Sequence, residues 1–232
     1  MKRRKSPAYW IFVRIPFWFV AGSLLLVAVL KWVPVFYTPL MLRRALEPDK
    51  TEKYAFRRHW RPLEQVSPEL VKAVIASEDN RFAEHRGFDW EEIRRMWKAH
   101  RDKGGRLRGC STISQQTAKN VFTFGSSTWA RKALEVWWTF LIERIWGKER
   151  IMEVYLNVIE AGPGIYGAEA AAQAWFGVDA RSLNRAQASA IAVCLPNPRQ
   201  WKPTGTGPYI TQRKAQGAAL IPKLAYPEWV GK

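Results

Sequence analysis

Glu78 is the residue of this chain whose position best suits acid–base chemistry. It shares one face of a predicted helix with Val71, Val74 and Ile75, because the four positions recur at i, i+3, i+4 and i+7. A carboxylate on an apolar face has its pKa raised toward neutrality, as a general acid or base requires. A glutamate at the end of a helix can equally bend out into solvent, since glutamate is seldom buried. The periodicity leaves both interpretations open.

The segment from residue 109 to residue 120 offers groups that could bind an anion. It predicts a helix start with Ser111 as N-cap, and the free backbone N–H groups there favour a negatively charged ligand. Gln115 and Lys119 are four residues apart, so an amide and an ammonium line one face of this helix. Because Gln116 follows directly, the glutamine pair is equally typical of a solvent-facing helix.

Arg131, Lys132 and Glu135 combine two cations and a carboxylate within two turns of another predicted helix. They could form ordinary salt bridges at i to i+4 and i to i+3, each worth about 0.2–0.5 kcal/mol. They could also hold a second carboxylate beside an anionic group. Arg95, which follows Arg94, also allows two interpretations. In isolation it would be a solvated surface residue, and next to a phosphate it would be a ligand.

The elements that must position these groups are predicted to be helices. Ser67 followed by Pro68 is typical of a helix start, with serine as N-cap and proline at the first helical position. Thr128 is the predicted N-cap of a longer helix that ends at Gly147. The expected buried side of that helix consists of Leu134, Trp138, Leu141 and Ile145.

A further helix is predicted to begin at Asp89, because Glu92 completes a capping-box pattern, and to stop at Gly104 and Gly105. Its expected inner face contains His100. We interpret His100 as packed core, because no second histidine, cysteine or carboxylate pairs with it at metal-ligand spacing. The other residues of this inner face are Ile93, Met96 and Trp97.

The rest of the chain has no regular alternation that demands a sheet and no repeat at solenoid spacing. The fold class is therefore predicted to be mostly α. The remaining predicted elements are a helix at 148–157 with Ile151, Val154 and Tyr155 inside, a loop at 162–164, and helices of small residues at 165–176 and 184–195.

An apolar segment near the amino terminus predicts a membrane anchor. With Lys31 snorkelling, residues 15–42 reach the roughly 20 residues that a bilayer crossing needs. A cleavable signal peptide is the competing interpretation, but residues 31–34 lack the small-x-small pattern of its cleavage site. The flanking positive charge lies on the amino-terminal side, so a basic tail, residues 1–14, stays in the cytoplasm and residues 43–232 are exported.

Composition limits the class of partner. The chain has 232 residues, 47% of them apolar, and 2 cysteines, which suits one compact domain plus an anchor without a disulfide framework. Lys and Arg number 37 against 20 Asp and Glu, so the formal net charge is +17. An exported basic domain favours anionic lipid or phosphorylated substrates, and nucleic acid becomes a poor candidate partner.

Four ordered motifs resemble those of the peptidoglycan glycosyltransferases. The resemblance covers about residues 60–200 and, with no transpeptidase module following, is to the monofunctional transglycosylases. It implies a lysozyme-like helical domain with a smaller membrane-associated lobe, preceded by one transmembrane helix in the bacterial inner membrane, with the catalytic domain in the periplasm. The motifs are EDNRFAEHRGFD at 78–89, GCSTISQQTAKN at 109–120, RKALE at 131–135 and KERIMEVYLN at 148–157.

The activity implied by the resemblance is polymerisation of lipid II into glycan strands, with inversion at the anomeric carbon and release of undecaprenyl pyrophosphate. Such a transfer needs a base on the acceptor hydroxyl and stabilisation of the departing charge. The resemblance assigns Glu78 as the base, Glu135 as a second catalytic glutamate and Asn157 as support for the cleft. The implied substrate-binding residues are Arg95, Ser111, Thr112, Gln115, Gln116, Lys119, Asn120, Arg131 and Lys132.

The expected partners are lipid II, the growing lipid-linked glycan, the membrane and other cell-wall synthesis proteins. No metal-ligand cluster is expected, and a divalent cation could arrive with the substrate pyrophosphate without a dedicated site. Phe122, Phe124 and Trp129 could enter the bilayer beside the lipid tail or could belong to the core. Two other functions remain as alternatives: a lysozyme-like lytic enzyme that cleaves glycan, and a noncatalytic membrane adaptor.

Overall fold

The computed structural model describes residues 10–46, 57–104, 110–124 and 128–231. Within these ranges the chain is mostly helical, which confirms the predicted fold class. The predictions for the basic tail before residue 10 and for Gly105 lie outside the described residues. The long helices are α2 (Ile15–Leu30), α3 (Pro39–Leu46), α4 (Pro68–Glu78), α5 (Trp90–Lys103), α6 (Ile113–Phe122), α7 (Trp129–Ile145), α8 (Gly147–Val158), α9 (Ala168–Phe176), α10 (Arg185–Ala192) and α11 (Pro208–Leu220).

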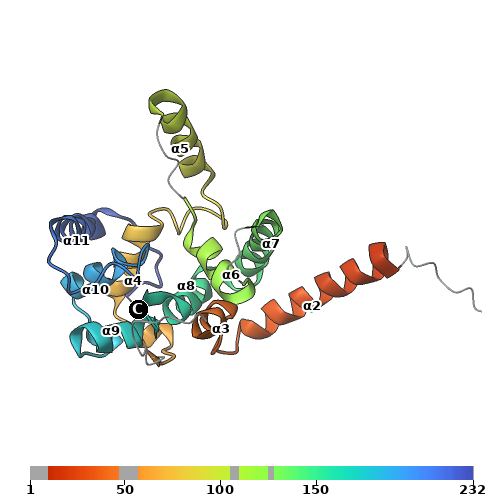
Figure 1. Cartoon of the computed structure of the whole chain (residues 1–232), viewed down its shortest axis with the longest axis horizontal. Coiled ribbons are helices and arrows are strands. Elements are labelled where there is room, and N and C mark those ends of the chain that lie inside the picture. Colours follow the sequence, from red (N-terminus) through yellow and green to blue (C-terminus); the bar gives the residue numbers. More distant parts are fainter. Residues whose placement is uncertain (1–9, 47–56, 105–109, 125–127, 232) are drawn as a thin grey trace, which may run out of the picture.

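The core lies where α4 packs against α10 and where α6 packs against α7 and α8 (Figure 1). Short 3-10 turns, Leu63–Gln65, Ala180–Ser182 and Ile221–Lys223, join the helices at the edges of this body. Helix α8 is the central element, since almost all of its side chains between 151 and 158 are buried. Its predicted inner residues Ile151, Val154 and Tyr155 are among them, so that prediction is confirmed.

A small sheet covers part of this body and was not expected from the sequence. Strands β1 (Arg57–Arg58), β2 (Glu160–Gly162) and β3 (Ile165–Tyr166) form it in the order β1-β3-β2, with β1 parallel and β2 antiparallel to β3. The helix predicted from residue 165 therefore begins only at Ala168. Strands of two or three residues are too short to show an alternating pattern.

Three of the four predicted N-caps are confirmed. Ser67, Asp89 and Thr128 each accept a hydrogen bond from a backbone N–H of the first turn. The prediction of Ser111 as N-cap is wrong by one residue. Thr112 caps α6 because it forms a reciprocal capping box with Gln115, which satisfies two backbone donors at once.

Helix α5 projects from the body (Figure 1). It has none of the buried side chains that the predicted inner face required, and Trp97 is 63% exposed. His100 is also exposed, so its interpretation as packed core was wrong. The other two residues of that face, Ile93 and Met96, are half-buried, so the face is covered only in part.

Helix α7 buries less of its predicted apolar side than expected. Trp138 and Leu141 are buried and Ile145 is half-buried, whereas Leu134 is 39% exposed. The helix ends at Ile145 with Trp146 as C-cap, and Gly147 follows with a φ of +79°, the position at which glycine terminates a helix, so the predicted stop is confirmed. Gly147 is also the first residue of α8. Leu134 lies in the first turns of α7, ahead of the part that is packed against α6 and α8.

Within the described residues, one helix is long and apolar enough to cross a membrane. It runs from a π-helical turn, Trp10–Arg14, through α2 to Leu30, with 21 residues and a mean hydropathy of 2.1. At 1.5 Å per residue its length is about 31 Å, close to the thickness of a hydrocarbon core. The predicted 15–42 segment is divided, because Pro34 cannot continue the helix. Helix α3 instead packs against α6 and buries Met41.

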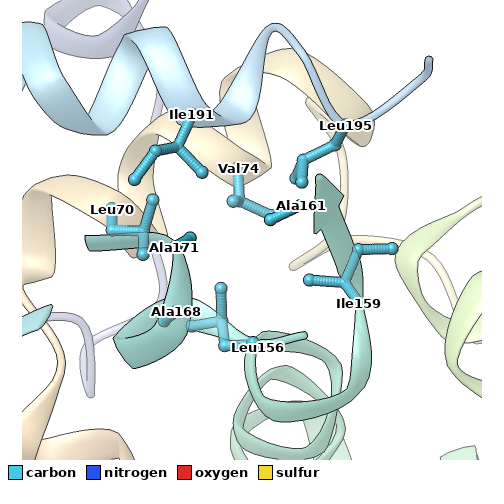
Figure 2. A pocket seen from close by; sticks show the side chains of 10 residues that line it. Leu70, Val74, Leu156, Ile159, Ala161, Ala168, Ala171, Ile191 and Leu195 are labelled. Atoms are coloured by element: carbon cyan, nitrogen blue, oxygen red, sulfur yellow. The ribbon is translucent and has the colours of Figure 1, made fainter. Parts of the chain in front are cut away.

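A small apolar cavity lies among α4, α8, α9 and α10 (Figure 2). Figure 2 shows aliphatic side chains converging on it from these helices, from strand β2 and from the turns after α8 and α10. Because its walls carry no polar side chain, it offers nothing to orient a ligand, and we interpret it as imperfect packing. Its lining residues are Leu70, Val74, Leu156, Ile159, Ala161, Gly167, Ala168, Ala171, Ile191 and Leu195.

Candidate active site

Glu78 is the last residue of α4 and is half-buried. Gln116 Nε2 on α6 donates a hydrogen bond of 2.9 Å to Glu78 Oε2, and Ser77 Oγ lies 3.4 Å from Oε1. Burial raises the pKa of Glu78 above its ordinary value, although both hydrogen bonds favour the ionised form. The carboxylate is therefore held inside the fold against α6, and the interpretation that it bends out into solvent is excluded.

Gln116 connects Glu78 to the buried centre of the molecule. Its other amide atom, Oε1, lies 3.2 Å from the hydroxyl oxygen of Tyr155, which is completely buried on α8. The three side chains come from α4, α6 and α8. Sequence analysis assigned Tyr155 to the core and did not connect it with Glu78, because the two lie 77 positions apart.

Asp79, next to Glu78, fixes the start of α6. Its carboxylate accepts a hydrogen bond of 3.0 Å from the backbone N–H of Ile113 and contacts His85 Nε2 at 2.9 Å. His85 Nδ1 accepts from the N–H of Gly87, so the ring proton lies on Nε2 and is donated to Asp79. These contacts place α6, and with it Gln116, beside Glu78. Asp79 and His85 were not among the predicted site residues, although both belong to the first motif.

A half-buried ion pair supports the same region from α7 and α8. Lys148 Nζ donates to Glu143 Oε1 at 2.7 Å, and Ser114 on α6 donates to the same oxygen. Burial lowers the pKa of Lys148, and the charge of Glu143 opposes that change. Removal of either partner would leave the other charge half-buried and unpaired, which is destabilising. The network therefore fixes α6 relative to α7 and α8.

Lys119 and Asn120 lie one turn beyond Gln116 on α6. Three residues of helix correspond to about 4.5 Å along its axis, so Lys119 lies close to the Glu78–Gln116 pair in that direction. The side chain of Lys119 is exposed and Asn120 is buried. Of the two, Lys119 is therefore the one available to a ligand from solvent.

Arg131 and Glu135 form an ion pair on the first two turns of α7, with side chains only 15% and 17% exposed. Their partnership is an i to i+4 pair, as the spacing predicted. Lys132 is exposed and its ammonium lies 4.4 Å from the centre of the Trp129 ring. These cations lie on the first two turns of α7, the helix that packs against α6 through its later turns.

The other predicted binding residues are placed differently. Thr112 and Gln115 form the cap of α6, and the Thr112 hydroxyl donates to the carbonyl of Gly87 at 2.6 Å. Ser111 is exposed. Arg95 lies on the projecting helix α5, where it pairs with Glu92 at 2.9 Å. Thr112 and Gln115 thus have structural roles that account for their side chains in this structure.

Asn157 supports the main chain beside the core. Its Oδ1 accepts from the backbone N–H of Arg61 at 2.8 Å, and its Nδ2 donates to the carbonyl oxygens of Arg61 and Glu153 at the same distance. This side chain holds the segment before α4 against α8. It makes these bonds to the main chain and is nearly completely buried.

The aromatic residues around the α6–α7 connection fall into two groups. Phe122 stacks on Trp138 with ring centres 4.3 Å apart and therefore belongs to the core. Phe124 is 65% exposed and Trp129 is 83% exposed. Phe122 therefore belongs to the core, whereas the exposed Phe124 and Trp129 are available for contact with lipid.

Arg213 on α11 is a cation that sequence analysis did not single out. Its charge favours the ionised form of Glu78 and so opposes the effect of burial on the pKa of that carboxyl. The guanidinium lies 5.3 Å from the centre of the Trp201 ring and 5.8 Å from that of Tyr209. No local sequence signal distinguishes it from other arginines, because its relation to Glu78 depends on how α11 packs on α4.

No group of three or more His, Cys, Asp or Glu side chains in the described ranges is arranged to hold a metal ion. The groups that the structure brings together here are the Glu78 carboxylate, whose pKa burial raises, the Gln116 amide that donates to it, and Arg213, whose charge acts on it.

Comparison with known proteins places this arrangement in a family. The model of the Transglycosylase family matches residues 47–220. The chain is similar to the biosynthetic peptidoglycan transglycosylase of Pseudomonas aeruginosa, with 50% identity over 199 residues covering 85% of each chain. The proteins of the same name from Ectopseudomonas mendocina and Caulobacter vibrioides are each 48% identical, covering 94% and 89% of this chain and 94% and 90% of their own lengths. The chain therefore belongs to the transglycosylase family.

Proposed function

We propose that the chain is a peptidoglycan glycosyltransferase that polymerises lipid II into glycan strands. The observation that carries the proposal is the hydrogen bond from Gln116 to the half-buried Glu78, on a helix that presents Lys119 one turn later. This pairing places a carboxylate of raised pKa beside an amide donor, and the charge of Arg213 on α11 acts on the same carboxylate. The names of the similar proteins give the substrate class, since all three are biosynthetic peptidoglycan transglycosylases.

Glu78 acts as the general base. The acceptor's sugar hydroxyl transfers its proton to the Glu78 carboxylate as its oxygen attacks the anomeric carbon of the donor. The bond from that carbon to the pyrophosphate oxygen breaks, and its electron pair leaves with undecaprenyl pyrophosphate. Attack opposite the leaving group inverts the configuration and produces a β-1,4 linkage. Burial of Glu78 supports this role because it raises proton affinity.

The cations stabilise the charge that develops on the pyrophosphate. Lys119 and Lys132 are exposed, and Arg131 is held beside Glu135 at the start of α7. In this proposal Glu135 orients Arg131 and the acceptor or pyrophosphate groups that it meets. A divalent cation can arrive bound to the pyrophosphate, with no dedicated protein ligands. Arg95, on the projecting helix, belongs to the proposed binding set if that helix approaches the substrate when it binds.

The helix Trp10–Leu30 anchors the enzyme in the bacterial inner membrane, with its amino-terminal end on the cytoplasmic side and the catalytic domain in the periplasm. Its length and hydropathy support a single crossing. A lipid-linked substrate is then delivered by diffusion in the same membrane. Other cell-wall synthesis proteins are the expected protein partners in that compartment.

The test is incubation of the full-length chain in detergent with lipid II, and separately with preformed glycan strands. Glycan polymer with released undecaprenyl pyrophosphate supports the proposal. Shortening of preformed strands without polymer would instead identify a lytic enzyme. Glu78→Gln should retain its fold and lose on the order of a hundredfold to ten-thousandfold in turnover.

A matched control is Glu228→Gln, which removes the same charge from an exposed position near the carboxyl terminus. Its turnover should equal that of the unaltered chain. If Glu78→Gln polymerised lipid II as fast as this control, the assignment of Glu78 as base would be wrong.

A further inference from the structure

We propose that Tyr155 is a positioning residue for the base: through the side-chain amide of Gln116, it keeps Glu78 in the carboxylate form that accepts a proton. This inference rests on the proposed function, because it concerns the group assigned there as general base. It assigns a role at the site to a side chain that acts on Glu78 through Gln116 and does not contact the substrate.

The geometry is a chain of two hydrogen bonds. The Tyr155 hydroxyl lies 3.2 Å from Gln116 Oε1, and Gln116 Nε2 lies 2.9 Å from Glu78 Oε2. A side-chain amide has an acceptor end and a donor end. When its acceptor end faces Tyr155, its donor end faces Glu78, and a carboxylate is the form of Glu78 that accepts this bond.

The reversed amide would favour the opposite protonation state. With Oε1 of Gln116 facing Glu78, only the protonated acid could complete a hydrogen bond. In that orientation the Tyr155 hydroxyl would have no acceptor among the partners that the described chain provides. Tyr155 is completely buried, so a hydroxyl without an acceptor would be strongly unfavourable. The tyrosine donor therefore selects the amide orientation that suits a carboxylate.

Tyr155 can hold this role across the working pH range. Burial raises the pKa of its hydroxyl well above the ordinary value, and the nearby charges of Glu78 and Asp79 raise it further. The hydroxyl consequently remains a proton donor wherever Glu78 titrates. A serine or threonine at this position would be too short to reach from α8 to Gln116.

Several other groups also influence the pKa of Glu78, and the effect of Tyr155 must be separated from theirs. On α4, Ser77 donates to Glu78 and the charge of Asp79 disfavours its ionisation. On α11, Arg213 favours ionisation. None of these depends on the orientation of Gln116. Removal of the Tyr155 hydroxyl should therefore change only the contribution of Gln116 to the pKa of Glu78 and leave those of Ser77, Asp79 and Arg213 in place.

The experiment is the pH dependence of kcat/KM for lipid II polymerisation by the full-length chain, since its acidic limb reports ionisation of the free enzyme's base. In Tyr155→Phe the amide can reverse, so we expect the acidic limb to move upward by about 0.5–1 pH unit, or a threefold to tenfold loss at pH values below it. Near the optimum the loss should be smaller. Tyr226→Phe is the matched control, because it removes a hydroxyl that donates to the Ile221 carbonyl at 2.5 Å outside this site.

Gln116→Met provides a second measurement if Tyr155→Phe fails to fold. It removes both ends of the amide at similar volume, so the acidic limb should move by at least as much. A uniform loss of activity at every pH, with the limb unmoved in the folded variant, would show a merely structural tyrosine and overturn the inference. The proposed function fails separately, if Glu78→Gln remains active.

Discussion

The guanidinium of Arg150 on α8 donates a hydrogen bond of 2.8 Å to the main-chain carbonyl of Leu30, the last residue of α2. The same nitrogen lies 2.7 Å from the carbonyl of Val33, and Trp146 Nε1 donates to the carbonyl of Val27 at 2.7 Å. The last carbonyls of a helix lack partners within it, and a cation there interacts favourably with the helix dipole. The candidate anchor is thus bonded to the domain that carries Glu78.

We expect Arg150→Met to loosen this junction. Methionine keeps an apolar stem but loses the donors, and bonds to a charged group each contribute about 1.5–3 kcal/mol. Spin labels at Leu26 on α2 and Glu149 on α8, in a Cys110→Ser background, should then show a broader distance distribution in membranes. Arg144→Met is the control, because Arg144 is exposed and contacts the Phe140 ring. An unchanged distribution in Arg150→Met would contradict the prediction.

Glu78→Gln should stabilise the fold at neutral pH. Burial raises the pKa of Glu78 above 4.5, so the folded state holds this proton more tightly than the unfolded state. The stability that this provides is complete below the unfolded pKa and is lost as the pH rises through the folded pKa. The melting temperature of Glu78→Gln relative to the unaltered chain should therefore increase from pH 4 to pH 7. A difference that stays constant with pH would argue against a raised pKa.

The Arg131–Glu135 pair should behave as one unit in catalysis. If Glu135 acts by holding Arg131, then Arg131→Gln and Glu135→Gln should each lower kcat by about a hundredfold, the usual cost of losing one charge-stabilising donor. The kcat of the double variant should be little lower than that of the less active single variant. Initial rates of polymer formation measure this. Losses that multiply would instead give Glu135 a role independent of Arg131.

Gly167→Ala should destabilise the fold more than Gly177→Ala. Both glycines have positive φ, +85° and +66°. Gly177 is in the left-handed helical region, where alanine costs about 1–2 kcal/mol, whereas Gly167 has a ψ of 168° and lies in a region that essentially only glycine adopts. At Gly167 a Cβ would also lie 2.8 Å from the carbonyl oxygen of Asn157, whereas at Gly177 it would meet nothing within 4 Å. Thermal unfolding in one detergent compares the two. Equal shifts would mean that the chain around Gly167 relaxes without loss.

The sequence by itself determined the features that depend on near neighbours. The spacing of Val71, Val74, Ile75 and Glu78 predicted a helix with a carboxylate on its apolar face, and α4 ends at that carboxylate. The caps at Ser67, Asp89 and Thr128 follow from side chains that reach backbone groups two or three residues away. Such interactions are local, so a sequence pattern contains them.

The tertiary structure decided which side chains meet. It showed that Gln116 contacts Glu78 while Gln115 caps α6, a choice set by the rotation of α6 against α4. It brought Tyr155 to Gln116 from α8 and Arg150 to the end of α2. It also left the apolar face of α5 only partly covered. A periodic pattern states that a face is apolar, whereas packing angle and rotation between helices decide what that face contacts.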